Sequence, residues 1–210
     1  MVDNGAGMHH FLLSQKFASI NVWTYSLYQM KRKEKNDMRK RTAWETENRS
    51  FLSDLELGKK GEKRIISFLE KHKNVEKVVD ISDTEIGKRD DIDLEVHYTD
   101  GHISTVEIKT DTKAHITGNI AYEERSHRNP GCFARTKADH IFYLLQKTGQ
   151  AYVLNPNEFR KFIAEMKNDK ESAKQFGIRP VSMGEGAFGY LVPIKNLVST
   201  NVVECEMHVA

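Results

Sequence analysis

Two short segments combine acidic side chains and one lysine in a pattern suited to metal-assisted hydrolysis. Residues 92–98 alternate apolar and polar side chains, and residues 103–109 end in the triplet Glu107-Ile108-Lys109. Side chains two residues apart in a strand share a face, so Glu107 and Lys109 point the same way. This triplet gains functional meaning if a further carboxylate, that of Asp93, joins it.

The register of the hairpin between these segments decides whether Asp93 does so. Asp100-Gly101 is a strong hairpin signal, and a two-residue loop there would pair Asp93 with Ile108, on the face opposite Glu107. A three-residue loop over residues 99–101, with the glycine in the left-handed position, is also favoured and pairs Asp93 with Glu107. We adopt this longer loop because it alone separates a polar from an apolar face. The polar face then gathers Asp91, Asp93, Glu107 and Lys109, and the apolar face Ile92, Leu94, Val96, Tyr98, Val106 and Ile108.

Carboxylates that converge in this way repel one another, which raises their pKa values unless a cation lies between them. Oxygen ligands favour a hard ion, Mg²⁺ or Mn²⁺, that keeps several waters and accepts phosphate oxygens. Such an ion activates a bound water and polarises a phosphoryl oxygen. Lys109 could orient or deprotonate that water, or neutralise charge on the phosphate. The group therefore predicts phosphodiester hydrolysis.

The motifs Asp91-Ile92-Asp93-Leu94 and Val106-Glu107-Ile108-Lys109-Thr110, joined by the Asp-Gly turn, resemble those of the PD-(D/E)XK nuclease superfamily. The resemblance implies a restriction-endonuclease-like α/β fold, with a mixed central β-sheet flanked by helices. It implies Asp93 and Glu107 as metal ligands assisted by the backbone carbonyl of Ile108, and Lys109 as the catalytic lysine. The literal Pro-Asp pair is absent from this sequence.

A glutamate upstream adds to the resemblance. Gly61-Glu62 begins a predicted helix, and Glu62 lies three, four and seven residues before Ile65, Ile66 and Leu69, on the inward face. Members similar to DNA-repair and junction-resolving nucleases carry such a glutamate over the metal, which implies Glu62 as an accessory carboxylate. The alternative is a first-turn glutamate favoured by the helix dipole.

Residues downstream of the hairpin look like a phage-type branch of the superfamily, related to junction-resolvase-like nucleases. Residues 117–123 and Thr136-Lys137-Ala138-Asp139 carry this likeness, which extends over residues 58–154. The segment 125–137 contains no acidic residue and predicts a mobile loop on nucleic-acid backbone, or a merely solvated loop. Lys137 is expected at a helix start beside the site. The candidate nucleic-acid contacts are Arg125, Arg128, Arg135 and Lys137.

Composition bounds the class of protein. Charged residues make up 30% and hydrophobic residues 39%, a balance that suits a soluble globular protein and excludes low-complexity classes. The net charge of +2 does not by itself indicate a polyanionic partner. Two cysteines indicate a reducing, cytoplasmic location, and the phage-type likeness suits a phage-encoded protein in a bacterial host. Residues 11–30 are too polar for a membrane span.

We expect an N-terminal arm over residues 1–50 and a nuclease-like domain over residues 51–210. A stripe at helical spacing in the arm predicts a helix that docks on the domain or on a second subunit; its members are Phe17, Ile20, Trp23 and Leu27. Residues 31–41 form either a solvated linker or a basic arm on nucleic acid. The order helix, strands, helix, strands predicts α/β or α+β around a mixed sheet. Further strands are expected at 75–81, 116–122, 141–145, 151–154 and 190–194. A further helix, capped by Asn157, is expected from the apolar stripe of Phe159, Phe162, Ile163 and Met166.

Two other motifs are weaker indications of function. His127, Cys132 and His140 match no familiar zinc spacing, and the glycine triplet over residues 184–189 lacks the strand-then-helix context of a dinucleotide site. The sequence thus predicts a Mg²⁺- or Mn²⁺-dependent deoxyribonuclease, a structure-selective endonuclease of Holliday-junction-resolvase type with a role in DNA recombination. Cutting two strands favours a homodimer. The alternatives are a sequence-specific endonuclease, an exonuclease, or a catalytically inactive nucleic-acid-binding protein on the same fold.

Overall fold

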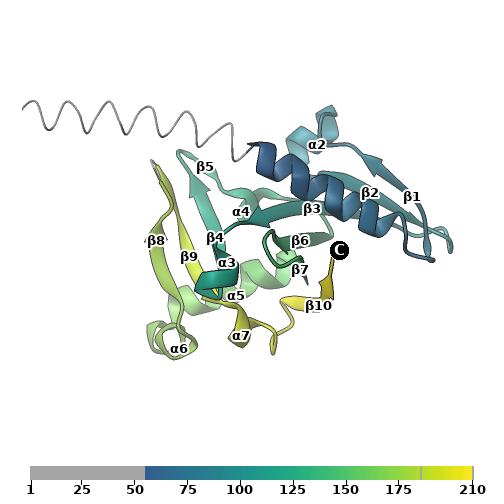
Figure 1. The fold of residues 1–210 in the computed structure, drawn as a ribbon. Helices are drawn as coiled ribbons and strands as arrows, with labels where there is room; N and C mark the ends of the chain where they lie inside the picture. The colour runs from purple at the N-terminus through teal and green to yellow at the C-terminus, as the bar shows by residue number, and fades with distance from the viewer. Residues whose placement is uncertain (1–54, 185, 210) are drawn as a thin grey trace, which may run out of the picture. The chain divides into compact units, whose positions relative to one another are not determined.

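A six-stranded mixed sheet forms the centre of the structure, a computed structural model that describes residues 55–184 and 186–209 (Figure 1). Its strands lie in the order β1-β2-β3-β6-β7-β10. Among these six, β3 and β6 pair in parallel and the other neighbours are antiparallel. The strands are β1 (Val75–Asp80), β2 (Leu94–Tyr98), β3 (Ile103–Asp111), β6 (His140–Leu145), β7 (Gln150–Leu154) and β10 (Val203–His208).

A second, antiparallel sheet is built from chain segments that lie before and after α5 and α6. Its strand order is β5-β4-β9-β8, with β4 (Asn119–Ser126), β5 (Asn129–Pro130), β8 (Arg179–Ser182) and β9 (Ala187–Pro193). A helix over residues 55–69 precedes β1. The later helices are α2 (Glu85–Asp90), α3 (Ala114–Thr117), α4 (Cys132–Arg135), α5 (Pro156–Asn168), α6 (Lys170–Phe176) and α7 (Ile194–Leu197).

Alternating side chains of β6 face two separate hydrophobic clusters. Phe142 packs in one cluster with Ile65 of the helix over residues 55–69. Ile141 packs in the other cluster with Phe159 of α5. Because successive side chains of a strand point to opposite faces, both faces of the central sheet are covered. The expected mixed α/β fold with a mixed central sheet flanked by helices is therefore confirmed.

Some predicted element boundaries are wrong. The strand expected from residue 116 begins at Asn119, because residues 114–117 form α3, which ends at the left-handed Gly118 (φ 66°). The strand expected over residues 190–194 runs from Ala187 to Pro193. The N-cap of α5 is Asn155 rather than Asn157, since the Asn155 side chain accepts the N–H groups of residues 157 and 158.

The segment expected as one mobile loop, residues 125–137, is instead divided among ordered elements. It comprises the end of β4, the strand β5 and the helix α4. Lys137 follows α4 and does not begin a helix, which corrects that expectation. Its backbone N–H instead donates to the carbonyl of Asp90 (2.8 Å).

The predictions for the arm over residues 1–50, including its apolar stripe and the basic run 31–41, lie outside the described residues, as does the arm–domain boundary. None of the helices in the described part of the chain is long and apolar enough to cross a membrane.

Candidate metal and catalytic site

The β2–β3 hairpin has the predicted register. His97 pairs with Ile103 and Leu94 with Val106, and Gly101 adopts the left-handed conformation (φ 85°) that the three-residue loop requires. Asp93 lies immediately before β2, and its backbone N–H donates to the Val106 carbonyl (2.9 Å). Asp93 is therefore opposite Glu107, as the sequence predicted.

Glu107 is the most buried of the predicted site residues, with 3% of its surface exposed. The Lys109 ammonium lies 2.7 Å from Glu107 Oε1, as their shared strand face requires. Asp93 Oδ2 accepts the backbone N–H of Ile108 (2.7 Å). Since the N–H and C=O of one strand residue point to the same edge, the Ile108 carbonyl also faces the side of Asp93.

Asp91 occupies a special backbone position. It is the left-handed C-cap of α2 (φ 57°), and its carbonyl accepts the hydroxyl of the buried Thr136 (2.6 Å). Asp91 Oδ1 accepts a hydrogen bond from Arg135 (2.5 Å). Asp91 Oδ2, in contrast, is buried and has no hydrogen-bond partner among the described residues. Such an orphaned carboxylate oxygen indicates a missing cationic or donor partner.

Asp91 is also one of three side chains that bring potential metal-ligand atoms together. Asp91, Glu107 and Cys132 each offer one atom, and these atoms lie within 4.8 Å of one another. The Cys132 thiol also donates to Glu107 Oε1 (3.7 Å). Asp93 does not belong to this triplet, because its carboxylate turns toward the Ile108 N–H. We refer to Asp91, Asp93, Glu107 and Lys109 together as the carboxylate cluster.

Burial and mutual repulsion disturb the titration of the cluster. Burial raises the pKa of Glu107 to about 8, with Asp93 and Asp91 adding to the rise and Lys109 opposing it. Burial likewise raises the pKa of Asp93, although the Ile108 N–H partly offsets it. For Lys109, burial acts to lower the pKa, but Cys132, Glu107 and Asp91 outweigh it and raise the pKa above its usual range. Carboxyl groups thus exceed the cations available to them.

Glu62 approaches the cluster from the opposite face of the sheet. Its helix crosses β3 at Gly61, where an added Cβ would lie 1.8 Å from Thr110 Oγ1, and Thr110 alternates with Lys109 along the strand. Burial raises the pKa of Glu62, and the charges of Asp93 and Asp80 raise it further. The expectation that Gly61-Glu62 begins the helix is wrong, since the helix is already formed at residue 55. Glu62 is therefore no first-turn residue, which removes the helix-dipole alternative.

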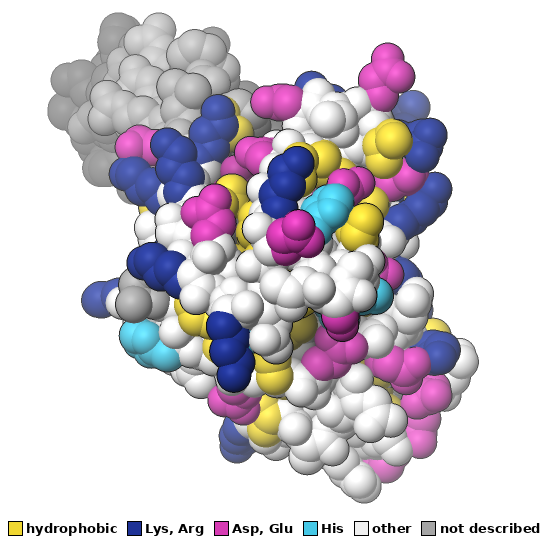
Figure 2. All heavy atoms as spheres, turned by 90° about the vertical axis from the view of Figure 1, so that its right-hand side faces the viewer, with side chains coloured by type: hydrophobic (Ala, Val, Ile, Leu, Met, Phe, Trp, Pro, Cys, Tyr) yellow, Lys and Arg dark blue, Asp and Glu magenta, His cyan; other side chains and the backbone are white. Residues whose placement is uncertain are grey.

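The four predicted nucleic-acid contacts fall into two groups. Arg135 binds Asp91, and Lys137 lies 2.8 Å from Asp90, so both are paired with acids beside the cluster. Arg125 and Arg128 lie on the β4–β5 hairpin and line a hollow of about 450 Å³. On the face shown in Figure 2, acidic and basic side chains are interspersed.

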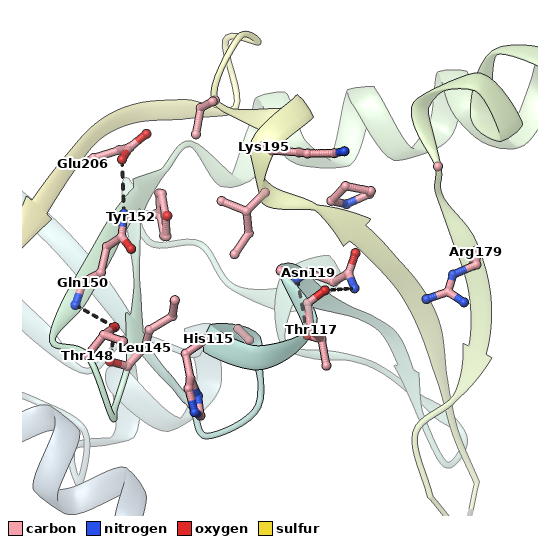
Figure 3. A pocket seen from close by; sticks show the side chains of 16 residues that line it. His115, Thr117, Asn119, Leu145, Thr148, Gln150, Tyr152, Arg179, Lys195 and Glu206 are labelled. Carbon is pink, nitrogen blue, oxygen red and sulfur yellow. Dashed lines mark hydrogen bonds between the residues drawn. The ribbon is translucent and has the colours of Figure 1, made fainter.

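A separate hollow of about 720 Å³ lies between α3, β7, α7 and β10. Figure 3 shows that His115, Arg179 and Lys195 border it from different elements, and that Gln150 donates to Glu206 at its edge. No residue of the carboxylate cluster lines this hollow. The chemistry of the hairpin and the hollow of Figure 3 are thus independent features.

Sequence reasoning did not identify Cys132 and Thr136 as parts of the site. Cys132 was grouped with His127 and His140, but those three do not converge in the described part of the chain; His140 instead contacts Glu204 (2.6 Å). The only local signal for Thr136 was its place before Lys137. No protein-family model, curated protein or solved structure matches this chain. What the arrangement offers chemically is carboxylate oxygens and one thiol next to a lysine, and carboxylate oxygens are donors that a hard divalent cation prefers.

Proposed function

We propose that the chain is a metal-dependent DNA nuclease that hydrolyses phosphodiester bonds, with a restriction-endonuclease-like fold of the PD-(D/E)XK type. The observation that carries the proposal is that Asp91 and Glu107 offer ligand atoms within 4.8 Å of each other, beside Lys109, with Asp91 Oδ2 buried and unpartnered among the described residues. The mixed sheet flanked by helices agrees with this fold type. The resemblance of the hairpin motifs supplies the substrate class.

The donor set fits a divalent cation. Asp93, Glu107 and the Ile108 carbonyl would hold it, as the resemblance implies, and Asp91 Oδ2 is a further free oxygen. Oxygen donors of this kind suit Mg²⁺ or Mn²⁺. When bound, such an ion acidifies a water and polarises a phosphoryl oxygen.

Lys109 is assigned the role of catalytic lysine, as a charge stabiliser or as the base that acts on the attacking water. In the metal-free protein, against the effect of burial, Cys132, Glu107 and Asp91 raise its pKa, which favours the ammonium form suited to charge stabilisation. Contact with Glu107 Oε1 at 2.7 Å fixes the position of the ammonium, from which it can neutralise charge that develops on the phosphate. Glu62, close enough to Asp93 for their charges to interact, serves as the accessory carboxylate.

The proposed substrate is branched DNA, cut by a structure-selective endonuclease of junction-resolving type that acts as a homodimer. Arg125 and Arg128 are exposed and lie on the same hairpin, where they would contact the DNA backbone. Arg135 and Lys137 are paired with acids, so their first role is to position the cluster.

The test is a cleavage assay on labelled linear duplex, single-strand, flap and four-way junction DNA, each with Mg²⁺, Mn²⁺ or EDTA. Cleavage should require the metal and fall by at least about 100-fold in Lys109→Ala and Glu107→Ala, while folding and DNA binding persist. Lys113→Ala, which removes an exposed lysine four residues away, is the matched control and should cut normally.

Two outcomes would contradict the proposal. Wild-type cleavage by Lys109→Ala would remove the catalytic assignment. Binding without cleavage of any of the four substrates, with either metal, would instead favour the inactive nucleic-acid-binding protein.

A further inference from the structure

A groove of about 620 Å³ lies between α5 and α6 on one side and β8 and β9 on the other. Three exposed lysines, Lys167, Lys170 and Lys174, line it, and none of its described lining residues is acidic. Its apolar lining is formed by Ile163, Met166, Ala173, Ile178, Pro180 and Tyr190. We call this feature the lysine groove.

The lysine groove adjoins the hollow beside the β4–β5 hairpin, because Lys167 lines both. Phe188 lines the hollow and Tyr190 the groove, and their rings lie on one face of β9 with centroids 5.5 Å apart. The guanidinium of Arg125 lies 5.9 Å from the centroid of the Phe188 ring. Glu124, the acidic residue that lines the hollow, is paired with Lys167 (2.5 Å).

Cations of α5, α6 and β4 thus lie around two partly exposed aromatic rings of β9, a combination that suits one class of polyanion. Single-stranded nucleic acid offers regularly spaced phosphates and unstacked bases, which bind to lysines and aromatic faces respectively. A duplex keeps its bases inside the stack and cannot use the two rings. The chain's own basic run, residues 31–41, would be repelled by the lysines.

We propose that the lysine groove and the adjoining hollow bind a single-stranded segment of nucleic acid, with bases on Phe188 and Tyr190 and phosphates on Lys170 and Lys174. As a substrate site, this surface rests on the proposed nuclease function. It adds to that function the requirement that the substrate has an unpaired strand. The chain itself links the two sites: α4 follows β5 directly, and its Arg135 reaches Asp91 of the carboxylate cluster.

The experiment measures binding of fluorescently labelled oligothymidine to the full chain by anisotropy, in EDTA so that no metal-dependent cleavage occurs. The double variant Lys170→Glu/Lys174→Glu should raise the Kd at least about tenfold and lower the slope of log K against log salt by about 1.4, or about 0.7 for each phosphate contact. Tyr190→Leu keeps an apolar side chain but removes the ring, and should weaken binding about tenfold through lost stacking.

The matched control is Lys63→Glu/Lys71→Glu, which makes the same change in charge at exposed positions of the helix over residues 55–69 and the turn after it. It should bind oligothymidine nearly as the wild type does. Equal losses in the control and the groove variant, or an unchanged Kd in the groove variant, would overturn the proposal. Tight binding of polyglutamate at the groove, with no binding of oligothymidine, would also overturn the proposal and would assign an acidic peptide as the ligand.

Failure of this proposal is distinguishable from failure of the nuclease. Metal-dependent cleavage of linear duplex DNA, which offers no unpaired strand to the groove, is measured in parallel and tests the carboxylate cluster. A protein that cuts DNA but binds oligothymidine independently of the groove lysines overturns the groove assignment only. A protein that binds through the groove yet never cuts leaves the groove assigned and removes the nuclease.

Discussion

Glu107 is the residue on which burial, repulsion and attraction act together. With only 3% of its surface exposed, it contacts the Lys109 ammonium and the Cys132 thiol through the same oxygen. Asp91, the C-cap of α2, and Asp93, immediately before β2, supply negative charge nearby. The carboxyl group of Glu107 therefore holds its proton more tightly in the folded protein than in the unfolded chain.

The raised pKa of Glu107 predicts how the stability of the metal-free protein depends on pH. The pKa of Glu107 is about 8 when folded against a usual value of 4.5, so between these values the folded state binds more protons than the unfolded state. The free energy of unfolding should then decrease as the pH rises through this window, by up to about 1.4 kcal/mol per pH unit for one proton. Thermal unfolding in EDTA between pH 5 and pH 8 measures this.

Glu107→Gln supplies the control, because the amide is close in shape and does not titrate. Its stability should fall less steeply with pH than that of the wild type, with a residual slope from Asp93 and Glu62, whose pKa values are also raised by burial. Added Mn²⁺ should stabilise the wild type more at pH 8 than at pH 5, since the ion binds ionised carboxylates. An identical pH slope in the variant and the wild type would contradict the assignment.

Much of the site at the residue scale could be predicted from the sequence, and there is a physical reason why the remaining contacts could not. Asp93, Glu107 and Lys109 follow from strand periodicity, which is local. The orphaned Asp91 oxygen depends on Thr136 and Arg135, which are more than forty positions away in the chain and hold the Asp91 carbonyl and its other oxygen. Such contacts arise from packing, and no spacing in the sequence encodes them.

At the scale of elements, the crossing of the first described helix over β3 positions Glu62. An added Cβ at Gly61 would lie 1.8 Å from Thr110 Oγ1 and 3.0 Å from Thr110 Cβ. Gly61→Ala should therefore force the helix away from the strand and lower the free energy of unfolding by about 1–3 kcal/mol. Chemical denaturation measures the loss.

Gly58, three residues earlier in the same helix, is the matched control. Its added Cβ would be in ordinary contact with Glu62 Oε1 at 3.8 Å, so Gly58→Ala should be neutral or should stabilise by up to about 1 kcal/mol through helix propensity. Adding Thr110→Ala to Gly61→Ala should restore part of the stability, since it removes two of the three close atoms. Wild-type stability of the single Gly61→Ala variant would show that the helix does not depend on this close approach.

Elements differ in how well their sequence defines them. The register of the β2–β3 hairpin was predicted correctly because its alternation and its Asp-Gly turn agree, although β2 begins at Leu94 rather than at residue 92 and β3 continues to Asp111. The pairing of the second sheet was not predicted, because its central contact joins β4 to β9 across more than sixty residues. The strands next to them in the sequence, β5 and β8, are only two and four residues long and give little signal. The basic segment seemed a loop by composition, yet Arg160 of α5 donates to the carbonyls of Phe133 and Thr136 and so holds α4 and the residue after it.

At the scale of the whole molecule, the proposed substrate sets a requirement that one carboxylate cluster cannot meet. A four-way junction has two strands to be cut at related positions, and a protein with a single site must supply a second copy to cut both. The sequence offers an apolar stripe of helical spacing for this contact, through Phe17, Ile20, Trp23 and Leu27. We therefore expect the full chain to be a homodimer, which size-exclusion chromatography with light scattering measures directly.

Ile20→Glu/Trp23→Glu places two charges on that stripe and should shift the chain to a monomer, because burying unpaired charges in an apolar contact is costly. The monomer keeps every residue of the carboxylate cluster, so it should still nick linear and flap DNA while losing paired cuts in a junction. Ser14→Glu/Ser26→Glu adds the same charge at polar positions of the segment and should stay dimeric. A wild-type chain that resolves junctions by paired cuts as a monomer would separate junction cleavage from dimerisation, and the arm would then need another role.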